Sequence, residues 1–186
     1  IGGVGLIKDY KKMITMDFKQ TDNLVIIIGK TEGHIDQSLF ARTILDEKNG
    51  LPPEVNLFNE KNNGNSLLNL IEKNLVVSAH DVSLGGILTA LSKMCIKGNK
   101  GIKIEKIKNL MTDIEFFFAE DQGRYLVEIN PKDLKEVSKI LDKNSVHHEK
   151  IGIISENDVI IDKETKVTID ELKTYNSNWL TNYMNS

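Results

Sequence analysis

The chain has 186 residues, with 24 Lys or Arg against 27 Asp or Glu, so its formal net charge is −3. Hydrophobic residues make up 40% of it, which is enough for a core and excludes disorder over most of the chain. The small negative charge argues against a dedicated nucleic-acid-binding protein. Only Arg42 and Arg124 are available for bidentate contacts to phosphate.

Cys95 is the only cysteine, which excludes an internal disulfide and a cysteine zinc cluster and predicts a reducing, cytoplasmic setting. The longest apolar run covers residues 24–28, far short of the roughly 20 residues that cross a bilayer, so no membrane is expected as a partner. No signal peptide is visible. The chain begins Ile-Gly-Gly without Met, and we expect it to be a piece of a longer protein.

The first half of the chain alternates strand-like and helix-like segments. Residues 23–29 hold five adjacent aliphatic residues between polar residues and Gly, which predicts a central strand buried on both faces. Alternation predicts a strand over 13–18, and residues 4–7 fit a linker or a first strand. The spacing then predicts, in order, a helix over 38–45, a helix over 54–60, a turn over 62–65, a helical stripe over 67–71 and a strand over 75–78.

The second half holds the clearest helix, over 86–96, with Gly98 predicted as its left-handed C-terminal cap. A second helix is predicted over 131–141, and strands over 102–104, 124–129, 146–154, 159–161 and 167–169. Leu172, Trp179, Leu180 and Tyr183 lie at helical spacing in the tail, with Trp179 predicted to anchor that helix to the body. The irregular alternation predicts an α+β fold, a mixed β-sheet flanked by helices.

The strongest candidate for chemistry is the junction over residues 76–86, Val-Val-Ser-Ala-His-Asp-Val-Ser-Leu-Gly-Gly. A buried strand leads through a turn and a glycine pair into the best helix, so backbone N–H groups and the positive end of a helix dipole meet there. Asp81 can hold Mg²⁺ through one oxygen, Ser83 can donate to a phosphate, and His80 can donate a hydrogen bond or carry a proton. Gly85 and Gly86 let a ligand approach closely.

The structural alternative for this junction needs no ligand. Asp81 or Ser83 caps the following helix, His80 is a half-buried side chain with its partner, and the two glycines serve packing alone. No Walker loop or dinucleotide fingerprint is present to decide between the two interpretations.

A second segment, Phe116 to Arg124, places three aromatic residues before an acidic pair, a glycine and an arginine. Arg124 can pair with Glu120 or reach an anionic ligand. We favour a structural interpretation, with core Phe residues and an ion-paired Arg124. His147 and His148 point to opposite faces of their predicted strand, which argues against joint metal binding, and Cys95 is interpreted as a core residue.

The strand–His-Asp-Val-Ser-x-Gly-Gly–helix segment resembles the C-terminal domain of the aminoimidazole ribonucleotide synthetase superfamily. Within it the chain is most similar to the synthetase subunit of the phosphoribosylformylglycinamidine synthase family. Three stretches support this resemblance: the N-terminal Ile-Gly-Gly-Val-Gly-Leu-Ile, Phe-Phe-Ala-Glu-Asp-Gln-Gly-Arg-Tyr-Leu-Val at 117–127, and Ile-Gly at 151–152. The chain departs from the family's pattern at Leu84, where the family has Asp, and at Ala119, where it has Gly.

The resemblance implies that residues 1–186 form one C-terminal domain of a longer, ATP-dependent purine-biosynthesis ligase. In this family ATP phosphorylates the amide oxygen of formylglycinamide ribonucleotide, and ammonia from a glutaminase subunit or domain then displaces phosphate. Asp81 corresponds to a Mg²⁺-contacting aspartate and Ser83 to a nucleotide-contacting serine. His80, Gly85 and Gly86 are expected beside the same nucleotide.

The resemblance also implies that the catalytic residues, including the family's histidine, lie upstream of this chain. Ammonia is expected from a separate protein, because the chain ends soon after Trp179. The fragment alone is expected to be inactive. Two other functions stay open: a non-catalytic interaction domain, and a domain of a sibling ATP enzyme such as selenophosphate synthetase or thiamine-phosphate kinase.

Overall fold

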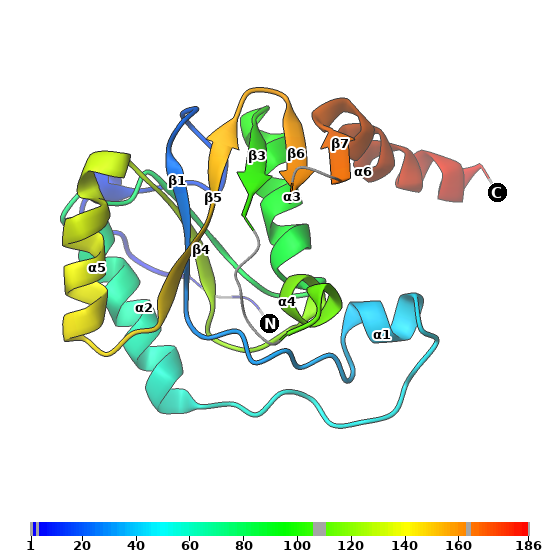
Figure 1. Ribbon diagram of the computed structural model, residues 1–186, viewed down its shortest axis with the longest axis horizontal. Coiled ribbons are helices and arrows are strands. Elements are labelled where there is room, and N and C mark those ends of the chain that lie inside the picture. The colour runs from blue at the N-terminus through cyan, green and yellow to red at the C-terminus, as the bar shows by residue number, and fades with distance from the viewer. Residues whose placement is uncertain (1, 3, 106–110, 163–164, 186) are drawn as a thin grey trace.

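Seven strands form one mixed sheet, in the order β2-β4-β1-β5-β3-β6-β7, in the computed structural model, which describes residues 2, 4–105, 111–162 and 165–185 (Figure 1). The strands are β1 (Leu24–Ile28), β2 (Ser78–Asp81), β3 (Gly101–Ile104), β4 (Tyr125–Ile129), β5 (His148–Ser155), β6 (Asp158–Ile161) and β7 (Thr165–Thr168). Only the β3–β6 pair is parallel, and the other five neighbouring pairs are antiparallel.

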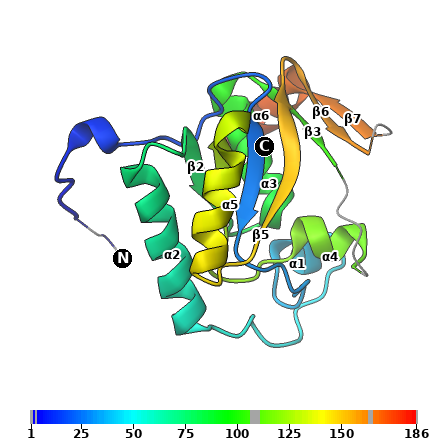
Figure 2. The ribbon, with the colours of Figure 1, turned by 60° about the vertical axis from the view of Figure 1, so that its left-hand side comes forward.

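Helices cover both faces of this sheet (Figures 1 and 2). The helices are α1 (Leu39–Thr43), α2 (Leu57–Glu72), α3 (Gly86–Gly98), α4 (Asp113–Phe118), α5 (Leu134–Lys143) and α6 (Ile169–Met184), with short 3₁₀ turns at Tyr10–Lys12 and Pro131–Asp133. One cluster of buried residues joins α3 and α4 to one face, and a second joins α2 and α5 to the other. This architecture confirms the predicted α+β fold.

The β1 strand is the centre of the molecule, as its aliphatic run predicted. All five of its residues are buried, and it is hydrogen-bonded to β4 on one side and β5 on the other. Val25 and Ile27 enter the α3 cluster, whereas Leu24, Ile26 and Ile28 enter the α2–α5 cluster. A strand with apolar layers on both faces reads as a continuous hydrophobic run because neither face meets water.

The α2 helix corrects the prediction of two helices separated by a turn over 62–65. One helix runs from Leu57 to Glu72, and the side chains of Asn62 and Asn63 inside it have partners in other segments. Asn62 donates through Nδ2 to the Asn144 carbonyl at 2.7 Å, and Asn63 donates through Nδ2 to the Gly123 carbonyl at 2.9 Å. Their side chains therefore bond across to other segments and do not compete with the helix backbone.

The predicted strand over 13–18 is wrong. That segment is irregular, and the backbone N–H groups of Lys19 and Gln20 donate to the buried carboxylate of Glu128 at 2.8 and 3.0 Å. The strand expected over 75–78 lies further along as β2, and residues 4–7 form neither helix nor strand.

Two end positions also differ from expectation. The left-handed cap of α3 is Asn99, while Gly98 is needed because a Cβ there would overlap the backbone of Phe18. The tail forms α6, as predicted, but Trp179 does not anchor it: Trp179 is 66% exposed and stacks on Tyr183, with ring centroids 5.5 Å apart. Val167 and Thr168 end β7, and Ile169 belongs to α6. Within the described residues, no helix has the length and apolar character required to span a membrane.

Candidate functional site

The junction between β2 and α3 places His80 and Asp81 at the end of an edge strand paired with β4. The His80 side chain is 15% exposed, and its Nδ1 lies 3.2 Å from the Asp81 carboxylate. Its Nε2 is buried with no hydrogen-bond partner in the described chain. Burial lowers the pKa of His80, and nearby Lys93 lowers it further, while Asp81 opposes both.

Asp81 and Ser83 do not cap α3. The helix has no side-chain cap, and its cap position is Gly85 in the left-handed region with φ 82°. Asp81 is 63% exposed on its side chain, and Ser83 is also exposed. The structural alternative is therefore wrong for these two side chains, because neither caps the helix and Asp81 contacts His80 instead.

The glycine pair serves close packing, and its N–H groups already have partners. A Cβ on Gly86, which has φ 70°, would lie 2.6 Å from the Phe117 carbonyl oxygen. The Gly85 N–H donates to the Glu120 carboxylate at 2.8 Å, and the Gly86 N–H donates to the Ser83 carbonyl at 3.0 Å. The anion that meets the start of α3 is thus Glu120 of the same chain.

Glu120 fixes two helices at once. The oxygen that accepts from Gly85 also accepts from the Leu39 N–H, the first residue of α1, at 2.7 Å. Leu84, where the family has Asp, is 59% exposed, so the side chain at this position faces solvent. Ala119 is fully buried, and its φ of −59° needs no glycine.

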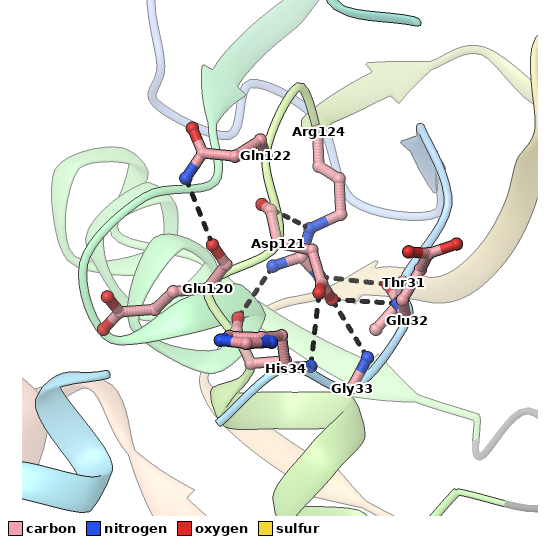
Figure 3. Close-up of polar contacts among 9 residues, drawn as sticks. Thr31, Glu32, Gly33, His34, Glu120, Asp121, Gln122 and Arg124 are labelled. Atoms are coloured by element: carbon pink, nitrogen blue, oxygen red, sulfur yellow. Dashed lines mark hydrogen bonds and ion pairs between the residues drawn. The ribbon is translucent and has the colours of Figure 1, made fainter. Parts of the chain in front are cut away.

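Arg124 is buried and held by a loop beside this junction (Figure 3). Its Nε donates to the Asp121 carbonyl at 3.1 Å, Nη1 to Thr31 Oγ1 at 3.0 Å and Nη2 to the Ala119 carbonyl at 2.7 Å. The Asp121 carboxylate lies 3.8 Å from Nη1 and balances the charge. The structural interpretation of this segment is confirmed, with Asp121 in place of Glu120 as the ion-pair partner.

The aromatic residues before this loop are core residues, as predicted. Phe116 and Phe117 are buried edge to face with centroids 5.0 Å apart, and Phe118 stacks on Phe40 at 4.8 Å. The Phe40–Phe118 contact joins α1 to α4.

Asp121 organises a second loop that sequence reasoning missed (Figure 3). Its carboxylate accepts the N–H groups of Glu32, Gly33 and His34 at 2.9, 3.1 and 3.2 Å. Gly33 has φ 85°, which lets the three amides converge. The acidic pair followed by glycine was the sequence feature that pointed to this loop. The sequence does not show which backbone amides the Asp121 carboxylate accepts from.

A polar cavity of about 530 Å³ lies between these loops and α2, and we call it the α2 cavity. Its walls come from the loop after β1, the start of α2 and the Asp121–Gln122 turn. Lys30, Glu32, Glu54, Asn59, Glu60 and Asn63 are among its lining residues. None of the residues singled out at the β2–α3 junction lines it.

His34 lines the α2 cavity, whereas His147 and Cys95 are not among its lining residues. His34 meets the Leu51 carbonyl through Nε2 at 2.8 Å, and His147 meets Glu149 at 3.0 Å. Cys95 is buried in the core, and burial raises its pKa to about 12. No group of three His, Cys, Asp or Glu side chains able to hold a metal ion occurs in the described part of the chain.

Comparison with known families decides the relationship. Residues 20–163 match the family model described as AIR synthase related protein, C-terminal domain. The chain belongs to this family. The match covers the sheet from β1 to β6 and includes the β2–α3 junction.

Among curated proteins, the chain is similar to one kind of protein in the AIR synthase related family. The chain is 62% identical over 184 residues to phosphoribosylformylglycinamidine synthase subunit PurL of Pelagibacter ubique (strain HTCC1062), covering 99% of this chain and 25% of that protein. It is 37% identical to the subunit of the same name from Caldanaerobacter subterraneus, covering 96% of this chain and 24% of that one. The resemblance to the synthetase subunit is confirmed, and the chain spans about a quarter of these relatives.

Solved structures support the fold. The PurL of Thermotoga maritima complexed with FGAR has a TM-score of 0.72 at 20% identity, covering 87% of this chain and 29% of that one. Thiamine-monophosphate kinase from Stenotrophomonas maltophilia K279a has a TM-score of 0.56 at 15% identity, covering 81% and 53%. At these identities the likeness concerns the arrangement of the sheet and helices alone.

Proposed function

We propose that this chain is the C-terminal domain of a phosphoribosylformylglycinamidine synthase synthetase subunit, a cytoplasmic ligase of purine biosynthesis. The complete enzyme converts formylglycinamide ribonucleotide, ATP and glutamine-derived ammonia to the amidine, ADP and phosphate. The observation that carries the proposal is 62% identity, over almost the whole chain, to a curated PurL. The PurL of Thermotoga maritima has been solved with ATP and, in a separate structure, with FGAR, which agrees with these substrates.

Within that enzyme this domain supplies one wall of a Mg–nucleotide site. Asp81 contributes one carboxylate oxygen to Mg²⁺, and its exposure and single partner, His80, leave it able to do so. Since the described residues hold no group of three ligating side chains, the remaining ligands would come from phosphate, water and the upstream domains. Magnesium there offsets phosphate charge.

Ser83 and His80 are the groups proposed to meet the nucleotide. Ser83 is exposed beside Asp81, and His80 keeps a buried Nε2 without a partner in the described residues. Gly85 and Gly86 take part through shape, because their N–H groups are already bonded to Glu120 and Ser83.

The partners follow from the same proposal. The domain packs on the upstream part of its own polypeptide, and a separate glutaminase supplies ammonia. The structure of PurLQS from Thermotoga maritima, whose PurL resembles this chain with a TM-score of 0.70, is consistent with an assembly of several subunits.

The test is turnover and nucleotide binding by the full-length protein. With ATP, Mg²⁺, formylglycinamide ribonucleotide and ammonia, it should form the amidine, while residues 1–186 alone should not. Mg-ATP should raise its melting temperature, since a ligand that binds only the folded state stabilises it, and Asp81→Ala should reduce that rise. Asp113→Ala, in the first turn of α4, is the matched control and should not.

Two results would count against the proposal. If the full-length protein shows no turnover and no thermal shift, it is a non-catalytic interaction domain. If it phosphorylates thiamine monophosphate or selenide and leaves the ribonucleotide unchanged, it belongs with the sibling enzymes.

A further inference from the structure

The α2 cavity is a built site outside the β2–α3 junction. Asp121 and Asn63 both line it, and both residues are only 7% exposed. Each is fixed by a hydrogen bond from or to the backbone: Asp121 by the amides of residues 32–34, and Asn63 by the Gly123 carbonyl at 2.9 Å. A wall made of fixed polar groups keeps its shape before a ligand arrives.

Acceptors in this cavity are left without partners. The carboxylates of Glu54 and Glu60 make no hydrogen bond or ion pair within the described residues, and Glu60 is half-buried. Asn63 uses only its Nδ2, so its Oδ1 accepts nothing from the described chain. Because Asn63 lines the cavity, this oxygen is an acceptor that a ligand there can use.

The charge of the lining selects the ligand. Four carboxylates, from Glu32, Glu54, Glu60 and Asp121, face one ammonium, Lys30, which is already paired with Glu32 at 2.8 Å. A phosphate is repelled by this wall. A metal ion alone is not held, because no three ligating side chains come together in the described residues. What fits is a ligand that donates hydrogen bonds to carboxylate and amide oxygens.

We propose that the α2 cavity binds the vicinal hydroxyls of a ribosyl group. A carboxylate accepting from ribose hydroxyls is a recurrent mode of nucleotide recognition. The volume of about 530 Å³ is ample for a pentose with part of its substituent. Glu60 and Asn63 lie three residues apart on α2, so both face the same side of the helix and reach one ligand together.

The proposed function supplies the two possible sources of such a ribosyl group, and the inference rests on it for their identity. One is formylglycinamide ribonucleotide, the other is the adenine nucleotide. The 119–124 loop separates the cavity from the β2–α3 junction: Glu120 bonds toward α3 and Asp121 toward the cavity wall. A ligand in the α2 cavity and a ligand at the β2–α3 junction would therefore lie on opposite sides of the same loop.

The experiment measures binding to the full-length protein by isothermal titration calorimetry, with formylglycinamide ribonucleotide and with ADP in separate titrations. Glu60→Gln keeps the side-chain shape and removes one ionised acceptor. A hydrogen bond from a hydroxyl to a charged group contributes enough that its loss should weaken affinity about tenfold. The matched control is Glu136→Gln on α5, an exposed glutamate outside the cavity, which should leave both affinities unchanged.

A second variant guards against misfolding. Asn59→Leu changes an exposed side chain of the cavity lining that makes no hydrogen bond within the described residues, and it should weaken the same ligand. The ligand that loses affinity identifies the source of the ribosyl group. Unchanged affinity for both ligands in both variants overturns the inference. If turnover is absent but the affinity loss is seen, the proposed function fails and the cavity assignment stands.

Discussion

Arg124 shows how one residue joins two loops that are distant in sequence. Its guanidinium bonds to Thr31 on one side and to the carbonyls of Ala119 and Asp121 on the other. Since the side chain is 1% exposed, water cannot replace any bond that is lost. The planar fork of an arginine can satisfy three acceptors in different directions, which a lysine ammonium on this path cannot do.

We therefore expect Arg124→Lys to loosen the loop over residues 31–34. The free energy of local opening should fall by about 2–3 kcal/mol, because buried carbonyls lose their donors. Hydrogen exchange of the Glu32, Gly33 and His34 amides in the full-length protein measures this. The control is Arg42→Lys, at the only other arginine, which is exposed. Equal exchange in both variants would show that the guanidinium does not hold the loop.

His80 predicts a dependence of stability on pH. Burial holds its pKa below the ordinary value of 6.5, so the unfolded chain binds this proton more readily than the folded one. The stability that neutral His80 provides is present above about pH 6.5 and is lost as the pH falls toward its folded pKa. His80→Gln should therefore reduce the drop in melting temperature between about pH 8 and about pH 5.5. A drop as large as that of the wild type would contradict the assignment.

At the scale of elements, the junction depends on where α3 meets α4. Gly86 lies against the backbone of residues 117–119, so the first residue of α3 has no room for a side chain. Gly64 is different: it lies inside α2, has ordinary helical backbone, and a Cβ there would meet only Tyr125 Oη at 3.5 Å. The two glycines therefore have opposite expected responses to the same substitution.

Gly86→Ala should destabilise the fold by about 1–3 kcal/mol, from its positive φ and from overlap with two carbonyl oxygens at 2.6 and 2.8 Å. Gly64→Ala should stabilise it by about 0.5–1 kcal/mol, since alanine favours the helix interior. Melting temperatures of the two full-length variants give the comparison. A loss on Gly64→Ala, or none on Gly86→Ala, would contradict this account of the packing.

At the scale of the whole molecule, large apolar side chains remain exposed on both terminal segments. On α6 these are Tyr175, Trp179, Leu180, Tyr183 and Met184, and the helix extends away from the sheet at the right of Figure 1. The N-terminal segment exposes Val4, Leu6 and Ile7. Exposed apolar groups at this density mark contact surfaces. They agree with a chain that spans about a quarter of its relatives' length.

The sequence alone determined the features that depend on local pattern. The five aliphatic residues of β1 and the start of α3 after the glycine pair were predicted where the structure has them, whereas the strand before that pair, expected over 75–78, lies at Ser78–Asp81. Such features follow from the hydrophobic periodicity and the backbone freedom of residues that are close in the sequence. The resemblance to the family came from the same segments.

Tertiary structure alone decided what each polar group meets. Asn62 and Asn63 lie inside α2 because distant carbonyls accept their side-chain amides, and the backbone N–H groups of Lys19 and Gln20 donate to the buried Glu128 carboxylate. The Gly85 N–H at the start of α3, which was expected to meet a ligand, donates to Glu120. Asp121 is the ion-pair partner of Arg124. The α2 cavity could not be predicted from the sequence for the same reason. Which partners a buried polar group meets depends on segments that only the folded chain brings together.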